Sequence, residues 1–177
     1  MKYAIAVVLA WLLAVANVSG LAYIKVLGVT PDFVLIFACC WAVLRSEEEA
    51  LVVVPLCGLF HDLLGSDPVG TAVLGFTPIV LLAALARTQA LDSEFPPAIA
   101  VVAGGTLCFT VIQTFVLAGT GHTIEVWHLL ISILIPAIVI NALFTPILYL
   151  PMRWLTPRRA LVMQGGRRFT APLTLKQ

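Results

Sequence analysis

The sequence predicts an all-α integral membrane protein with about six transmembrane helices and both termini in the cytoplasm. The first observation is composition: 61% of the 177 residues are hydrophobic, 11% are charged, and the mean hydropathy is +1.07. Such values lie far outside the range of soluble globular domains. The second is a series of uncharged runs long enough for helices that cross a bilayer. The third is the distribution of basic residues, which favours an even number of crossings.

Four uncharged runs can each hold a span of about 20 residues, and two shorter apolar runs, 33–44 and 50–61, lie between the first and second of them. Twelve residues of helix rise about 18 Å, which is short of a hydrocarbon core of about 30 Å. The short pair is therefore either a re-entrant hairpin or two spans extended by polar residues at their ends, and we favour two spans. The predicted spans are residues 3–24, 30–44, 50–65, 68–86, 97–118 and 127–150.

Short polar sequences mark the starts of the second and fourth spans. Thr30 can cap a helix, Pro31 suits a first helical turn, and Asp32 complements the positive end of the helix dipole. The sequence Ser-Asp-Pro at 66–68 repeats this order before the fourth span. Both sites predict a helix that begins directly after a turn.

Basic residues set the orientation of the spans. With the N-terminus inside, six spans place nine of the ten lysines and arginines on the cytoplasmic side, and only Lys25 falls outside. A re-entrant pair would also leave both termini inside. The first run resembles a signal peptide, but its removal would leave five spans and spoil this segregation. The prediction is a transmembrane domain over 1–152 and a basic cytoplasmic tail over 153–177, attracted to membrane lipids.

Few residues suggest chemistry. The four cysteines lie inside apolar runs without a CxxC pair, which is typical of packing. His122, Glu125 and His128 have the residue types of metal ligands, but their spacing spreads them around a helix. Cys57 and His61 are four residues apart, and we favour a buried thiol beneath an imidazole at the membrane edge. We expect no enzyme, no cofactor, no metal and no nucleic-acid partner.

Two features concern contacts between helices. Ala6, Ala10 and Ala14 recur every fourth residue, and such a stripe lets another helix approach closely, either in this chain or in a partner. Asn141 lies near the expected middle of the sixth span, where an amide is costly unless it is paired. We therefore expect Asn141 to form a hydrogen bond to another helix.

The sequence GLFHDLLGSDPVG at 58–70 concentrates polar residues at the outer end of the third span. Gly58, Asp62 and Gly65 lie on one face of that helix, so the glycines would let a neighbouring helix close in around the carboxylate. Asp62 is within one turn of the helix end, where a charge costs less than at the bilayer centre. It is either a buried hydrogen-bond anchor or a contact for a partner, and with three other acids it makes the predicted outer rim acidic.

The pattern G-x-x-x-D-L-L-G-x-x-P-x-G in this stretch resembles the signature region of the MreD family, the rod shape-determining membrane proteins of bacteria. PDFVLIFACCWAVLR at 31–45 resembles the second span of that family, and PILYLPMRWL at 146–155 resembles its last helix. The likeness covers most of the chain, but only residues 31–70 are distinctive. The predicted structural and interaction determinants, beside the alanine stripe, are Pro31, Asp32, Gly58, Asp62, Gly65, Pro68 and Gly70.

The resemblance implies a non-catalytic scaffold of the cell-elongation machinery in the bacterial inner membrane. Such a subunit binds MreC and helps to couple MreB filaments to peptidoglycan synthesis by RodA and a penicillin-binding transpeptidase. The resemblance also implies a fold similar to the S components of energy-coupling-factor transporters. The alternative is therefore a substrate-binding S-type subunit of a vitamin transporter, whose outward pocket would draw on Tyr23, His122, Trp127 and His128.

Overall fold

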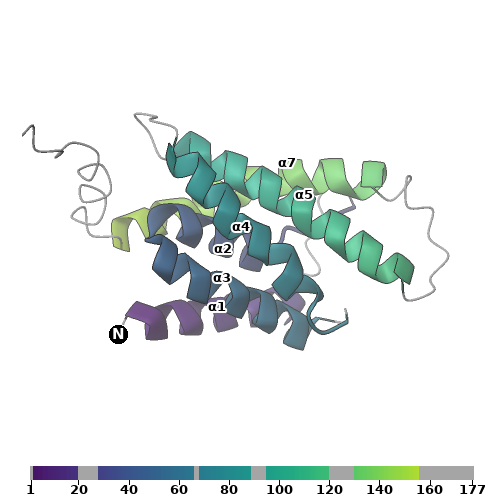
Figure 1. Ribbon diagram of the computed structural model, residues 1–177, viewed down its shortest axis with the longest axis horizontal. Coiled ribbons are helices and arrows are strands. Elements are labelled where there is room, and N and C mark those ends of the chain that lie inside the picture. The colour runs from purple at the N-terminus through teal and green to yellow at the C-terminus, as the bar shows by residue number, and fades with distance from the viewer. Residues whose placement is uncertain (1, 20–27, 66–67, 89–94, 120–129, 156–177) are drawn as a thin grey trace, which may run out of the picture.

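The structure is a computed structural model of the chain, which describes residues 2–19, 28–65, 68–88, 95–119 and 130–155 (Figure 1). It confirms the predicted all-α membrane protein. The helices are α1 (Lys2–Ser19), α2 (Phe33–Leu44), α3 (Glu47–Leu64), α4 (Thr71–Thr88), α5 (Phe95–Gly119), the short π-helix η2 (Leu130–Leu134) and α7 (Ile135–Leu155).

Three helical segments in the described ranges are long and apolar enough to cross a membrane, namely Thr71–Thr88, Phe95–Gly119 and Ser132–Trp154. Two shorter apolar helices, Tyr3–Ser19 and Phe33–Leu44, accompany them. The count of six complete spans stays a prediction, because α2 has only 12 residues and α3 begins with three glutamates.

Helix α2 is the centre of the bundle. All of its 12 residues are buried, and it contacts α1, α3, α4, α5 and α7. Figure 1 shows it behind α3 and α4, with α1 along one side. A helix that is apolar on every side is suited to such a position. The short helix α2 therefore lies in the core of the bundle, where the neighbouring helices surround it.

Two predicted helix starts were wrong. Asp32, with extended backbone angles, is the N-cap of α2, whereas Thr30 is exposed two residues before it. Helix α4 begins at Thr71, three residues later than predicted, and residues 66–67 lie outside the described part. The error has one cause in both places, because a carboxylate that accepts hydrogen bonds from several backbone N–H groups determines where the helix begins.

Other bounds shift as well. Helix α3 begins at Glu47, because Ser46 caps it and the glutamates at 47–49 stabilise the positive end of its dipole. Helix α7 continues to Leu155, so the described helix runs past the predicted start of the tail at 153. Residues 156–177 lie outside the described part of the chain.

The alanine stripe of α1 packs inside the bundle. Ala6, Ala10 and Ala14 are buried, and α1 packs against α3 and α2. The ring of Trp11 meets the ring of Phe60 edge to face, with 5.5 Å between the centroids. The stripe therefore faces other helices of this chain and not a partner, and its small side chains let the helix axes approach closely.

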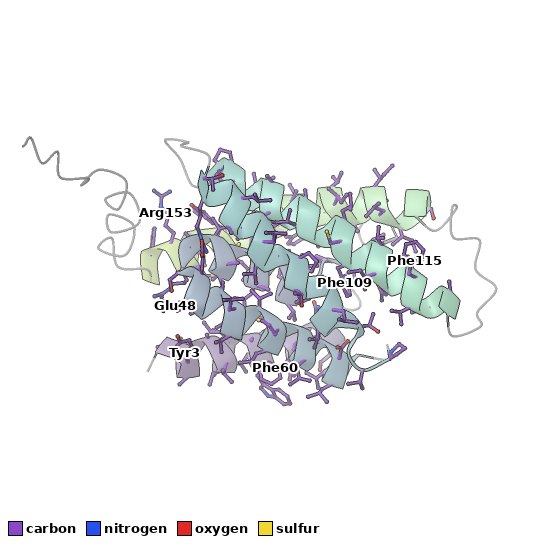
Figure 2. The ribbon with its side chains drawn as sticks, in the orientation of Figure 1. Tyr3, Glu48, Phe60, Phe109, Phe115 and Arg153 are labelled. Carbon is purple, nitrogen blue, oxygen red and sulfur yellow. The ribbon has the colours of Figure 1, made fainter. Side chains whose placement is uncertain are left out.

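Arg87 caps the C-terminal end of α2. The Nη2 group of Arg87 donates hydrogen bonds to the carbonyl oxygens of Ala42 and Arg45, the latter at 2.7 Å, and Nη1 lies 3.5 Å from Oε1 of Glu47. These carbonyls belong to the last turn and cap of α2, which have no partners within the helix. Figure 2 places Tyr3, Glu48 and Arg153 towards one end of the bundle.

Candidate functional site

Asp32 joins the ends of α1 and α2. Its Oδ1 atom accepts hydrogen bonds from the backbone N–H groups of Val34 and Leu35, both at 3.1 Å, and from Nδ2 of Asn17 at 3.0 Å. The backbone N–H of Phe33 completes the joint by donating to Oδ1 of Asn17 at 3.4 Å. One carboxylate oxygen therefore caps α2 and holds the last turn of α1 against it.

The other oxygen of Asp32 connects to α3. Oδ2 lies 3.2 Å from Nε2 of His61, and both side chains are largely buried. The imidazole also meets the rings of Phe76 and Phe109, with centroid separations of 5.8 and 5.4 Å. His61 is thus fixed by aromatic contacts from α4 and α5 and by a carboxylate at the start of α2.

Asn141 extends this network to α5 and α7. Its Oδ1 accepts from the backbone N–H of Asp32 at 3.0 Å, although the two residues are 109 positions apart in the sequence. Its Nδ2 donates to Oγ1 of Thr106 at 3.0 Å, and that hydroxyl donates to the carbonyl of Val102. The predicted hydrogen bond between helices is confirmed for Asn141. The network linked through Asp32, which we call the polar layer, consists of Asn17, Asp32, His61, Thr106 and Asn141.

Asp62 is not part of the polar layer, and it caps helix α4. Its carboxylate accepts hydrogen bonds from the backbone N–H groups of Gly70 at 2.9 Å, Ala72 at 2.8 Å and Val73 at 3.3 Å. The residue is only 2% exposed. These donors belong to the first turn of α4 and the residue before it, so the cap of α4 is supplied by α3.

The glycines and the proline around Asp62 make this cap possible. Gly58 lies one turn before Asp62, and a Cβ atom there would stand 2.8 Å from the backbone atoms Ala72 O and Val73 Cα. Gly70 has a φ of +101°, a conformation that residues with a side chain rarely adopt. The carbonyl of Pro68 accepts from both the N–H and the hydroxyl of Thr71. Residues 58–65 and 68–70 therefore act together to dock the first turn of α4 onto α3.

Substitution of Gly58 by alanine tests this close approach. The added Cβ meets backbone rather than a flexible side chain, so α3 and α4 must separate, and the hydrogen bonds of Asp62 lengthen. We expect the free energy of unfolding to fall by about 1–3 kcal/mol. Reversible unfolding of the purified protein in mixed micelles measures it. Gly119→Ala is the matched control, since nothing lies within 4 Å of a Cβ there. Equal stability of both variants would contradict the assigned contact.

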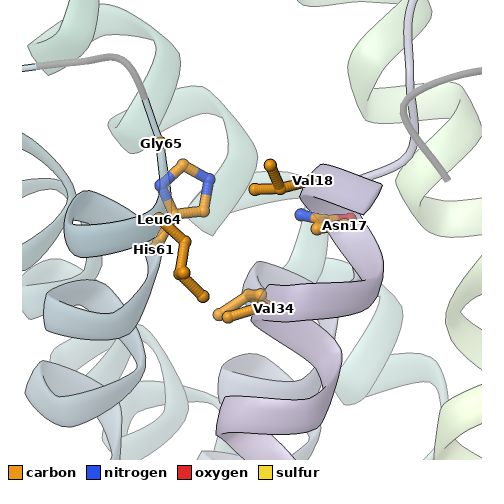
Figure 3. A pocket seen from close by; sticks show the side chains of 7 residues that line it. Asn17, Val18, Val34, His61, Leu64 and Gly65 are labelled. Carbon is orange, nitrogen blue, oxygen red and sulfur yellow. The ribbon is translucent and has the colours of Figure 1, made fainter. Parts of the chain in front are cut away.

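A cavity of about 390 Å³ lies beside the polar layer. Its walls come from the last turns of α1 and α3 and the first turn of α2 (Figure 3). Figure 3 shows Asn17 and Val18 on one side, with His61 and Leu64 facing them across the space. The full lining is Ala14, Asn17, Val18, Val34, His61, Leu64 and Gly65.

Comparison with known proteins assigns the family. The model of the rod shape-determining protein MreD matches residues 2–158, a range that includes every described helix. The chain belongs to the MreD family. Membership supports a role in rod shape determination, and the apolar helices place that role in a membrane. No curated protein and no solved structure matches the chain, so the likeness to S components stays a prediction.

Within this MreD family member, the structure brings the predicted determinants together in two groups. Pro31 is buried directly before Asp32, at the start of α2. The contact between α3 and α4 is made by Gly58, Asp62, Pro68 and Gly70. Gly65 is the C-cap of α3. The residues proposed for a vitamin pocket or a metal site, Tyr23, His122, Glu125, Trp127 and His128, lie outside the described part.

Sequence reasoning missed the partners of Asp32. The sequence patterns assign no partner to Asn17, and they predict for His61 only a place at the membrane edge above the thiol of Cys57. Cys57 is buried as expected, and His61 pairs with Asp32. Within the described ranges, no group of three or more His, Cys, Asp or Glu side chains is suited to hold a metal ion. An available signal was the presence of polar residues in the last turns of two apolar helices, which are costly in a membrane unless they are paired.

Proposed function

We propose that this chain is a non-catalytic, multi-pass scaffold in the bacterial inner membrane that binds MreC. Through MreC it helps to couple MreB filaments to peptidoglycan synthesis by RodA and its transpeptidase partner. Both termini are cytoplasmic in this proposal, because that orientation collects the basic residues on the inner side. Membership of the MreD family supports the proposal, and one feature of the structure carries it further.

That feature is the burial of Asp32 and Asp62, whose carboxylates bind groups within the chain itself. Asp62 accepts three backbone hydrogen bonds at the start of α4, and Asp32 is occupied by α2, Asn17 and His61. Carboxylates held in this way fix the arrangement of helices, and they are poorly placed to exchange protons with a substrate. A rigid bundle built by such caps suits a subunit whose task is to present a fixed surface.

The outer surface of the bundle offers apolar faces to other membrane helices. On α1 the exposed side chains include Ile5, Val8 and Leu12, and on α7 they include Leu143 and Ile147. Association of helices within a membrane depends on close packing of such faces. We expect the transmembrane helix of MreC to lie against one of them.

Affinity purification of the tagged chain from its host in mild detergent, followed by mass spectrometry, tests the partner. Recovery of MreC, with RodA and the transpeptidase at lower yield, is the expected result. Recovery of a pair of energy-coupling ATPases in place of MreC would overturn the scaffold proposal and favour the S-type transporter subunit.

Photo-crosslinking identifies the contact face. A photoreactive residue is placed at Leu12 of α1 or at Leu143 of α7, both exposed, and at the buried position Ala10 as the matched control. One of the exposed positions should crosslink to MreC, and Ala10 should not. Crosslinks from Ala10 alone would contradict the packing of the alanine stripe inside the bundle.

A further inference from the structure

One face of α4 points away from the bundle along most of the helix. Figure 1 shows α4 between α3 and α5, and it packs against these two helices and against α2. The exposed residues of α4, which we call the α4 seam, are Leu74, Thr77, Leu81, Leu85 and Thr88. Steps of three, four, four and three residues separate them, a repeat of 3.5 residues. This is the spacing of the contact face in left-handed pairs of helices.

The first half of the α4 seam carries polar groups that lipid chains cannot satisfy. Pro78 has no N–H, so the carbonyl of Leu74 lacks the donor that the helix would otherwise supply. The hydroxyl of Thr77 donates to the carbonyl of Val73 at 2.8 Å. Proline within a membrane helix is tolerated where a neighbouring helix or a hydroxyl supplies the missing donor. Because Leu74 is 62% exposed, the α4 seam favours a helix from outside this chain over lipid.

A second copy of α4 offers the matching donor. Two copies enter the membrane in one orientation, so their α4 helices can pair in parallel about a two-fold axis, where each residue of the seam meets itself. We propose that the α4 seam is the interface of a homodimer. Each Thr77 packs between Leu74 and Leu81 of the facing copy. Its hydroxyl turns from Val73 to the carbonyl that Pro78 leaves without a donor in that copy.

The same residue sets the register of the pair. A polar residue in an otherwise apolar seam selects the alignment in which it meets its equivalent. Thr77 lies between Leu74 and Leu81 in the α4 seam, so a shift of one turn would place its hydroxyl against leucine and lose both hydrogen bonds. The dimer leaves the exposed faces of α1 and α7 open, so it is compatible with the proposed contact with MreC and does not depend on it.

Cysteine crosslinking of the full-length chain in native membranes tests the interface. Leu81→Cys is introduced together with replacement of the partly buried Cys108 by alanine. Leu143→Cys on α7, in the same background, is the matched control, since Leu81 is 64% and Leu143 is 67% exposed. Mild oxidation should give about fivefold more homodimer from Leu81→Cys than from Leu143→Cys. Equal yields, or crosslinks from Leu81→Cys to a different protein alone, would overturn the proposal.

A pair of threonine variants tests the hydrogen bonds across the axis. Valine keeps the shape of threonine without the hydroxyl, and Thr77→Val should raise the dissociation constant of the dimer by about tenfold. Energy transfer between labelled copies in lipid bilayers measures this constant. Thr114→Val is the matched control and should leave it unchanged, because the hydroxyl of Thr114 makes the same local bond within α5, to the carbonyl of Thr110 at 2.7 Å. Equal constants for the two variants would overturn the α4 seam as the interface.

Discussion

Replacement of Asp62 by alanine should lower the free energy of unfolding by about 3 kcal/mol. The change removes the acceptor for the N–H groups of Gly70, Ala72 and Val73, in a place where Asp62 is only 2% exposed. Water cannot replace a buried acceptor without opening the contact between α3 and α4. The first turn of α4 should therefore fray, and the whole bundle should unfold at lower denaturant.

Unfolding in mixed micelles, followed by circular dichroism, measures this loss. Glu48→Ala is the matched control, because it removes an exposed carboxylate from the same helix. Its effect should stay within about 0.5 kcal/mol. Asp62→Asn should fall between the two, since its amide oxygen still accepts hydrogen bonds but carries no charge to face the helix dipole. A stability of Asp62→Ala equal to that of Glu48→Ala would show that the cap contributes nothing.

The same variant separates the two roles proposed for Asp62. If the carboxylate only holds α3 to α4, recovery of MreC should fall in parallel with stability, and growth at lower temperature should restore both. Loss of MreC from a fully stable Asp62→Ala protein would instead identify Asp62 as a direct partner contact. That role stays a prediction, and the burial of Asp62 argues for the first outcome.

Local patterns in the sequence were sufficient for the fold class and for part of the signature. Apolar runs predicted the helices, because the need to bury backbone polar groups in a bilayer leaves few alternatives to a helix. The face shared by Gly58 and Asp62 predicted a helix closing around the carboxylate, and α4 lies there. Asn141 was expected to bind another helix, and it bonds to Asp32 and Thr106.

Tertiary contacts decided what local patterns could not. The cap of α4 comes from α3, so the residues directly before α4 gave the wrong start. Arg87 caps α2 from two helices away, and no spacing along the chain indicates that contact. The pairing of His61 with Asp32 requires α2 and α3 to be antiparallel neighbours, which a single sequence does not reveal. Side chains that join helices are thus easy to suspect and hard to pair.

Replacement of Asp32 by alanine should have the largest effect on stability, about 3–5 kcal/mol. The change removes the N-cap of α2 and leaves Asn17 and His61 without their shared acceptor. Asn17 and His61 lie partly exposed in the wall of the cavity, so water replaces the carboxylate only incompletely, and the helix that loses its cap is α2, whose 12 residues are all buried. Chemical unfolding of the purified variant measures the loss.

Two further variants show which part of the loss comes from which contact. Thr30→Ala removes the exposed residue that sequence alone suggested as the cap, and it should change stability by less than about 0.5 kcal/mol. In a double-mutant cycle, Asp32→Ala and His61→Phe should be non-additive by at least about 1 kcal/mol, because each removes the same contact. Additive losses would mean that the contact with His61 adds nothing to the stability that Asp32 provides through the cap of α2 and its bond to Asn17. His61 would then be a neighbour of Asp32 without energetic coupling, and α3 would be held against α2 by its apolar contacts.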